Sequence, residues 1–168
     1  QTVGGNSTFG FSSADGDLNG ISLTTSGNSA TSSTITKASG SYVVTEDAQS
    51  SWELIDITIS GDTDVGSSTD VASRQASIDL DPGEDITVTF ENNKLSTITI
   101  VKETINGDGT FSFSSTDSDL NSITLTTTGN IATSNLIVKS AGTYSIAEES
   151  QSGWTLTNIA LAGDTAVS

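Results

Sequence analysis

The sequence has no cysteine, histidine or methionine, and only one proline among its 168 residues. These absences exclude disulfides, thiolate and imidazole nucleophiles, cysteine- or histidine-ligated zinc and haem sites, and a Ser-His-Asp triad. Basic residues are also scarce: five stand against twenty-one acidic residues, which gives a formal net charge of −16. Because nucleic acids and anionic membranes are bound through clustered Lys and Arg, neither is expected as a partner.

Long apolar runs are missing too, so the sequence predicts no membrane-spanning helix and no membrane insertion. No nucleophile–base pair is evident, and we therefore do not expect an enzyme. The scarcity of lysine and the lack of oxidation-prone cysteine and methionine favour an extracellular or cell-surface protein. Adaptation to high salt is an alternative explanation of the same acidic composition.

The residues that are present favour β structure. Thr, Ser, Gly, Val and Ile dominate, and apolar and polar residues alternate in stretches such as 86–90, 111–113 and 123–125. A period of two places one row of side chains inward and the other in water. Turn-forming clusters, for example at 81–83 and 106–109, separate these stretches. The pattern predicts an all-β chain of antiparallel β-sandwiches.

The chain also contains an internal repeat. Shifted by 102 residues it aligns with itself without a gap, and the aligned residues include Phe9 with Phe111, Tyr42 with Tyr144, Glu46 with Glu148 and Trp52 with Trp154. We therefore expect two tandem domains, residues 1–94 and 95–168. Compared with each other, the first lacks its first strand and the second lacks its closing strands. Either the sequence is part of a longer tandem array, or neighbouring copies complete each other by strand addition.

Three motifs carry a family resemblance. Residues 98–104 look like a first strand, residues 40–46 and 142–148 share a Gly-x-Tyr-x-x-x-Glu pattern, and residues 80–92 look like a closing hairpin ending in Phe-x-Asn. In this order they resemble the prealbumin-like, collagen-adhesin B-type repeat domains of bacterial or archaeal surface proteins. The resemblance implies tandem immunoglobulin-like or prealbumin-like antiparallel β-sandwiches.

Many members of that family carry a spontaneous Lys–Asn isopeptide bond promoted by a buried carboxylic acid. Matched by position, Lys102 is the reactive lysine and Glu148 the acid of the second copy, while Glu46 is the acid and Asn92 the acceptor of the first. The lysine of the first copy would immediately precede Gln1, and the asparagine of the second would follow the last residue. The alternative is that these residues are a solvated lysine, surface carboxylates and a turn asparagine.

A second group of candidates resembles the start of a calcium loop, in which oxygen ligands alternate along the chain. The candidate ligands are Asp15, Asp17 and Asn19, repeated as Asp117, Asp119 and Asn121. The twelfth loop position holds Ser26 or Thr128 instead of a bidentate acid. The alternative is an Asp/Asn-rich turn with no ion, and no other cofactor is expected.

These observations together predict a structural role. We expect a repeat unit of an extracellular filament, stalk or large surface adhesin, whose partners are copies of itself joined head to tail. The alternative is an adhesive module that recognises a glycan, a host protein or calcium through loops at one end of the sandwich.

Overall fold

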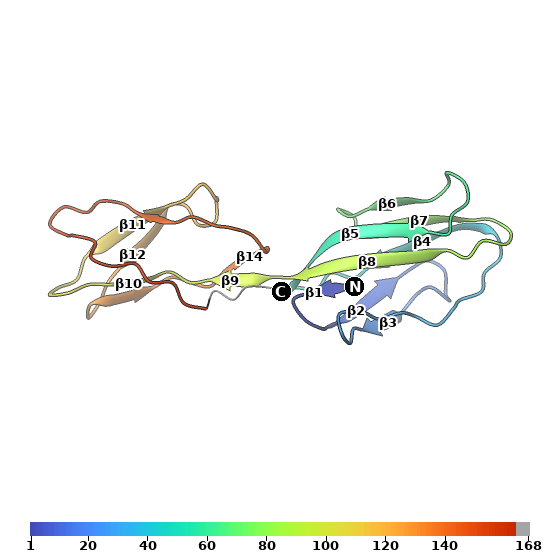
Figure 1. Cartoon of the computed structure of the whole chain (residues 1–168), viewed down its shortest axis with the longest axis horizontal. Coiled ribbons are helices and arrows are strands. Elements are labelled where there is room, and N and C mark those ends of the chain that lie inside the picture. Colours follow the sequence, from blue (N-terminus) through green and yellow to red (C-terminus); the bar gives the residue numbers. More distant parts are fainter. Residues whose placement is uncertain (164–168) are drawn as a thin grey trace. The chain divides into compact units, whose positions relative to one another are not determined.

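The computed structural model describes residues 1–163 and is all-β, with no helix in that range (Figure 1). The expected fold class is confirmed. The chain divides into two compact units, the first spanning Gln1–Leu95 and the second beginning at Ser96. The last five residues of the expected second domain, 164–168, lie outside the described residues.

The first unit is a sandwich of a three-stranded and a five-stranded sheet, ordered β1-β8-β5 and β3-β2-β4-β7-β6. Its strands are β1 (Thr2–Val3), β2 (Thr8–Ser12), β3 (Ile21–Thr24), β4 (Gly40–Glu46), β5 (Trp52–Ser60), β6 (Ser68–Asp70), β7 (Gln75–Leu80) and β8 (Thr87–Lys94). All pairings in this unit are antiparallel except β1 with β8, which run parallel. The first and last strands of the unit therefore lie side by side and point the same way.

Alternation along the strands builds the core of the first unit. The buried apolar side chains are Phe9, Phe11, Val44, Trp52, Leu54, Ile57, Ala76 and Phe90. In β5 a β-bulge between Leu54 and Asp56 breaks the period of two. Because the bulge adds one residue, the core row continues at Ile57 and leaves Asp56 in solvent.

The second unit contains shorter strands in three small sheets, ordered β10-β13, β12-β11-β15 and β14-β9. Its strands are β9 (Ser96–Ile98), β10 (Val101–Glu103), β11 (Thr110–Ser114), β12 (Ile123–Thr126), β13 (Ile131–Thr133), β14 (Ile137–Lys139) and β15 (Ala147–Glu148). Its core consists of Ile100, Phe111, Phe113 and Leu125, with Trp154 packed edge-on against Phe111 at 5.2 Å between ring centroids.

Two expectations need correction. Residues 80–92 do not form a closing hairpin, because β7 pairs with β4 in one sheet while β8 pairs with β5 and β1 in the other. The Asp81–Glu84 turn therefore belongs to a connection between the two sheets. The strand expected at 142–148 is reduced to Ala147–Glu148. In the first unit the equivalent strand, β4, is held along its length by β7, and no counterpart of β7 is found among the described residues of the second unit.

Candidate functional site

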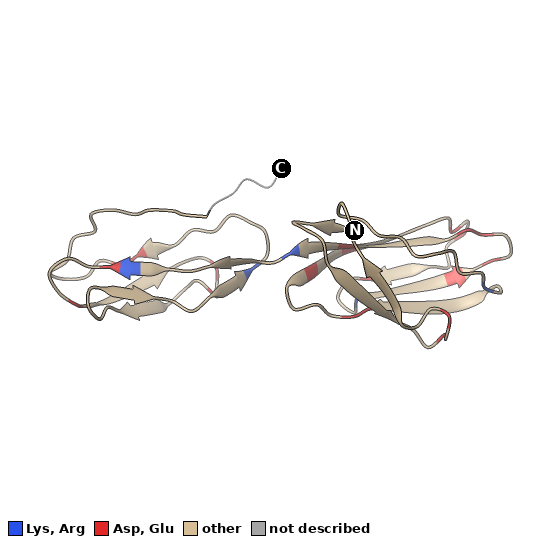
Figure 2. Cartoon of the chain, turned by 90° about the horizontal axis from the view of Figure 1, so that it is seen from below, with Lys and Arg blue, Asp and Glu red and all other residues tan. Residues whose placement is uncertain are grey.

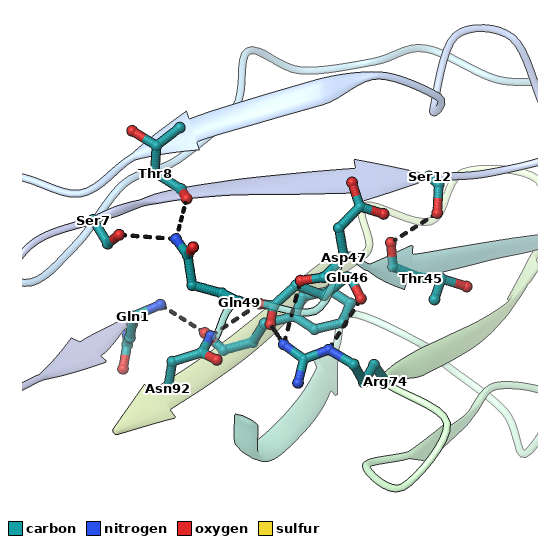
Figure 3. Close-up of polar contacts among 11 residues, drawn as sticks. Gln1, Ser7, Thr8, Ser12, Thr45, Glu46, Asp47, Gln49, Arg74 and Asn92 are labelled. Carbon is teal, nitrogen blue, oxygen red and sulfur yellow. Dashed lines mark hydrogen bonds and ion pairs between the residues drawn. The ribbon is translucent and has the colours of Figure 1, made fainter. Parts of the chain in front are cut away.

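The first unit holds a buried acid–amide pair. Glu46 ends β4 and Asn92 lies on β8, so the two side chains come from opposite sheets. Both follow the inward row of their strands, two residues after Val44 and Phe90 respectively, and each is 1% exposed. Asn92 Nδ2 donates to Glu46 Oε2 at 2.9 Å (Figure 3). The structure thus brings together the predicted acid and the predicted acceptor of the first copy.

The chain start lies against the same strand. Thr2 is the register partner of Asn92, the Asn92 backbone N–H donates to the Gln1 carbonyl at 3.0 Å, and the α-ammonium of Gln1 donates to the Phe90 carbonyl at 2.6 Å. Thr2 Oγ1 and Asn92 Oδ1 are both buried without a hydrogen-bond partner among the described residues. Buried polar atoms are usually paired, so these two oxygens leave hydrogen-bonding capacity unused inside the core.

Arg74, the only arginine of the chain, binds the same acid, and the sequence analysis did not single it out. Its Nη2 forms an ion pair with Glu46 Oε1, and its Nε donates to the Glu46 carbonyl at 3.1 Å. The Glu46 backbone N–H in turn donates to the Arg74 carbonyl at 2.9 Å. Burial raises the pKa of Glu46, while the hydrogen bond from Asn92 and the charge of Arg74 oppose that rise. The rarity of arginine was the one signal available in the sequence.

The second unit pairs the other two candidates. Lys102 Nζ lies 2.9 Å from both Oε1 and Oε2 of Glu148, joining β10 to β15. The ammonium also lies over the Phe111 ring, 4.3 Å from its centroid. Lys102 is 9% exposed, so it is a core lysine held by a carboxylate and an aromatic face. The solvated-lysine alternative does not describe it.

Each unit also has a hollow beside its pair. In the first, a cavity of about 490 Å³ reaches Glu46 and Asn92, and residues 29–37 form one wall. The equivalent residues of the second unit carry β13 and β14, which pair with β10 and β9. In the second unit, β9 and β10 therefore occupy a space whose counterpart in the first unit is this cavity.

In the second unit a different space is open, and its counterpart in the first unit is filled. A cavity of about 430 Å³ is lined by Lys102, Glu148 and the segments 103–106 and 153–158. In the first unit the equivalents of those two segments include β1 and the start of β5, with β8 between them. Leu156 and Ile159 are 48% and 72% exposed, whereas their equivalents Leu54 and Ile57 are 6% and 3% exposed.

In each unit, a lysine contacts the two aspartates of the calcium-loop candidate. Lys37 Nζ bridges Asp15 and Asp17 at 2.8 and 2.9 Å, and Lys139 bridges Asp117 and Asp119 at 2.7 and 2.9 Å. The hydrogen bond from the lysine lowers the pKa of Asp15 and of Asp117, and the two carboxylates raise the pKa of each lysine. An ammonium thus lies between the carboxylates that the calcium hypothesis assigned to a metal.

The asparagines of these loops close the turn. Asn19 Oδ1 accepts from the Ser13 backbone N–H at 3.1 Å, and Asn121 Oδ1 accepts from that of Ser115 at 3.1 Å. Within residues 1–163, no three acidic side chains gather in a way that could hold a metal ion. Figure 2 shows the acidic residues spread over loops and strands rather than collected at one place.

Repeated sequence, all-β units and charged or amide side chains inside each core define a tandem pair of β-sandwich repeat domains. A family model described as a prealbumin-like fold domain matches residues 1–94 and again residues 98–167. The chain therefore belongs to the prealbumin-like fold domain family, and the expected resemblance is confirmed. Domains of this type are structural repeats of pilins and other surface proteins. No curated protein and no solved structure matches the chain. Residues 1–163 contain no helix that is long and apolar enough to span a membrane.

Proposed function

We propose that these domains are structural repeats of an extracellular filament, stalk or large surface adhesin. Neighbouring modules complete each other's sandwiches, and a Lys–Asn isopeptide bond clamps each completed module. One observation supports the proposal: equivalent glutamates of the two units contact an asparagine amide and a lysine ammonium. Glu46 contacts the amide acceptor in the first unit, and its equivalent Glu148 contacts the lysine in the second.

The strand register supports the position proposed for the lysine. Thr2 is buried and is paired in parallel with Asn92. The residue two positions before Thr2 would lie on the same face of the strand and opposite Phe90. Its equivalent in the second unit is Lys102, whose side chain enters the core. A lysine at this position would therefore approach Asn92 and Glu46 from the side of the open cavity.

The strand that would fill this cavity is a copy of residues 96–102. In the second unit, β9 and β10 pair with β14 and β13, and Ile100 between them is a core residue. The first unit exposes the equivalents of β13 and β14 to its cavity. A β strand added to an exposed edge gains main-chain hydrogen bonds together with pockets for alternate side chains.

The chemistry requires a neutral lysine amine. The ammonium gives one proton to the Glu46 carboxylate, and the amine nitrogen then attacks Cγ of Asn92. As the new C–N bond forms, the protonated Glu46 passes its proton to Nδ2, the Cγ–Nδ2 bond breaks, and Nδ2 leaves as ammonia. The second proton lost by the lysine nitrogen passes to the freed Glu46 carboxylate, which then releases it to solvent. Glu46 Oε2 already contacts Nδ2, so this carboxyl is placed to return a proton to the leaving nitrogen.

A bond between the first and last strands suits a load-bearing repeat. It closes the loop that contains the whole sandwich and removes conformational freedom from the unfolded chain, as a long-range disulfide does. The net charge of −16 keeps such a fibre soluble and separate from similar surfaces. The adhesive alternative has less support, because lysines occupy the loop carboxylates on which its calcium form depends.

The proposal is tested with the full chain extended by a copy of residues 96–102 ahead of Gln1, which places a lysine directly before Gln1. We expect the extension to raise the melting temperature of the first unit and the intact mass to be lower than calculated by one ammonia. The matched control carries methionine in place of the copied lysine. It should show the rise in melting temperature without the loss of mass.

Two results would contradict different parts of the proposal. An extension that raises the melting temperature without any loss of mass would eliminate the isopeptide clamp and leave strand completion. An extension that leaves the melting temperature unchanged would eliminate strand completion itself.

A further inference from the structure

The polar cluster around Glu46 contains one cation that a lysine–acid–asparagine set does not require. Arg74 lies in the turn between β6 and β7 with a left-handed φ of 58°. This turn returns the chain so that two hydrogen bonds join Arg74 and Glu46: the side-chain Nε of Arg74 donates to the Glu46 carbonyl, and the Glu46 backbone N–H donates to the Arg74 carbonyl. The guanidinium is therefore anchored to the backbone of the residue whose carboxyl it binds.

Because Arg74 is anchored in this way, the two carboxylate oxygens of Glu46 have different partners. Oε1 is engaged by Arg74 Nη2, and Oε2 accepts from Asn92 Nδ2 (Figure 3). The Arg74 side chain is 21% exposed while that of Glu46 is 1% exposed, so Arg74 is the partly exposed member of the ion pair and Glu46 the buried one. In the second unit Glu148 binds Lys102 with both oxygens, and no arginine occurs in that half of the sequence.

From this arrangement we infer that Arg74 is a positioning residue for amide-bond formation in the first unit: it fixes which Glu46 oxygen faces the leaving nitrogen of Asn92 and keeps a positive charge beside the carboxyl group when the lysine arrives. The inference rests on the isopeptide chemistry proposed above. A planar guanidinium with several donors suits this task, because it binds the carboxylate and the backbone at the same time.

The charge effect has a definite sign. The charges acting on Glu46 are the Arg74 guanidinium and the α-ammonium of Gln1; in the extended chain the lysine ammonium enters from the side of Gln1. From β2, the register partner of Glu46 is the apolar Phe11. Transfer of the lysine proton needs the carboxylate form, so the rate falls below the pH at which Glu46 protonates. Removing Arg74 should move that acid limb to higher pH.

The test uses the extended full chain and follows the loss of ammonia by intact mass after refolding at a series of pH values. We expect Arg74→Met to slow the reaction at neutral pH and to shift the acid limb upward by about one pH unit or more, the usual effect of losing an adjacent opposite charge. Arg74→Lys should restore the position of the acid limb but only part of the plateau rate, because lysine has one nitrogen in place of the Nε and Nη2 that bind the Glu46 carbonyl and carboxylate.

The outcomes separate the role of Arg74 from the existence of the bond. If Arg74→Met lowers the melting temperature but leaves the acid limb where it is in the parent chain, Arg74 is structural and the inference is wrong. If Arg74→Met does not fold, the pH profile of Arg74→Lys decides. Lysine keeps the positive charge, so an acid limb that moves upward by about one pH unit or more in this variant would contradict the inference. If the parent chain forms no bond at all, the proposed function fails first.

Discussion

Asn92 Nδ2 lies 2.9 Å from Glu46 Oε2 in the first core, and the equivalent acid of the second core, Glu148, lies 2.9 Å from Lys102 Nζ. Equivalent glutamates therefore contact an asparagine amide in one unit and a lysine ammonium in the other. Glu46 is fully buried, and the Glu148 side chain is 13% exposed. The acid is the shared centre around which the candidate site is built.

The open slot of the second unit leads to the first prediction. A peptide that copies residues 87–95 should bind the full chain between the segments 103–106 and 153–158, because β8 occupies the equivalent place in the first unit. Its copy of Asn92 would then meet Lys102 and Glu148. We expect a covalent adduct whose mass is that of chain plus peptide less one ammonia.

Two matched controls sharpen this experiment. A peptide with Asn92→Ala should still bind but should form no adduct, and the chain variant Lys102→Met should bind the parent peptide without reaction. An adduct formed by Lys102→Met would show that another group reacts. Failure of the parent peptide to bind would show that the exposed Leu156 and Ile159 are not covered by a β8-like strand.

The second prediction concerns pH and the first unit. Because burial raises the pKa of Glu46 above 4.5, the folded state retains a proton that the unfolded state releases. The stability contributed by this group is fully present below pH 4.5 and is lost as the pH rises through the folded pKa. Glu46→Gln cannot titrate, so its free energy of unfolding should fall less than that of the parent chain over this range.

Denaturant unfolding at a series of pH values measures this difference. Trp52 reports on the first unit when Trp154→Phe removes the second indole. The control is Glu148→Gln, which changes the equivalent acid of the other unit and should leave the Trp52 curves unaltered. Parallel pH profiles for the parent chain and Glu46→Gln would contradict the prediction.

The third prediction concerns the aspartate loops. Lysine ammonium groups satisfy Asp15, Asp17 and their counterparts, so we expect neither calcium nor a chelator to change the melting temperature of the full chain. Lys37→Met should lower the melting temperature of the first unit, because two neighbouring carboxylates then repel each other. Lys94→Met, at an exposed lysine, is the matched control. A melting temperature that depends on calcium would restore the calcium hypothesis.

The fourth prediction compares two glycines with the same backbone conformation. Gly61 and Gly83 have φ values of +91° and +93°. A Cβ on Gly61 would lie 2.0 Å from the Asp85 carbonyl oxygen, whereas a Cβ on Gly83 would meet nothing within 4 Å. Gly83→Ala should cost about 1 kcal/mol of stability from the left-handed conformation alone.

Gly61→Ala should cost at least about 2 kcal/mol more than Gly83→Ala, because the backbone of Asp85 cannot move aside as a flexible side chain would. Both values come from equilibrium denaturation of the full chain with Trp52 as the probe. Equal losses for the two variants would mean that the approach of Asp85 to Gly61 is relaxed in solution.

Much of the fold could be predicted from local patterns. Alternation identified the strands that contain Phe111 and Ile123, and the internal repeat indicated two similar domains. The sequence also placed Glu46 and Asn92 in the same site, through a family resemblance. It could not show that β7 and β8 belong to different sheets, since a turn such as Asp81–Glu84 occurs in hairpins and in crossings between sheets alike.

The sequence by itself determined the all-β class, the repeat and the types of residue available for chemistry, because these depend on periodicity and composition along the chain. Tertiary structure alone decided which charges meet. Lys37 and Arg74 are both isolated cations in the sequence, yet one bridges two loop carboxylates and the other binds the buried acid. Such pairings depend on where distant strands cross, and the spacing of residues along the chain does not encode that position.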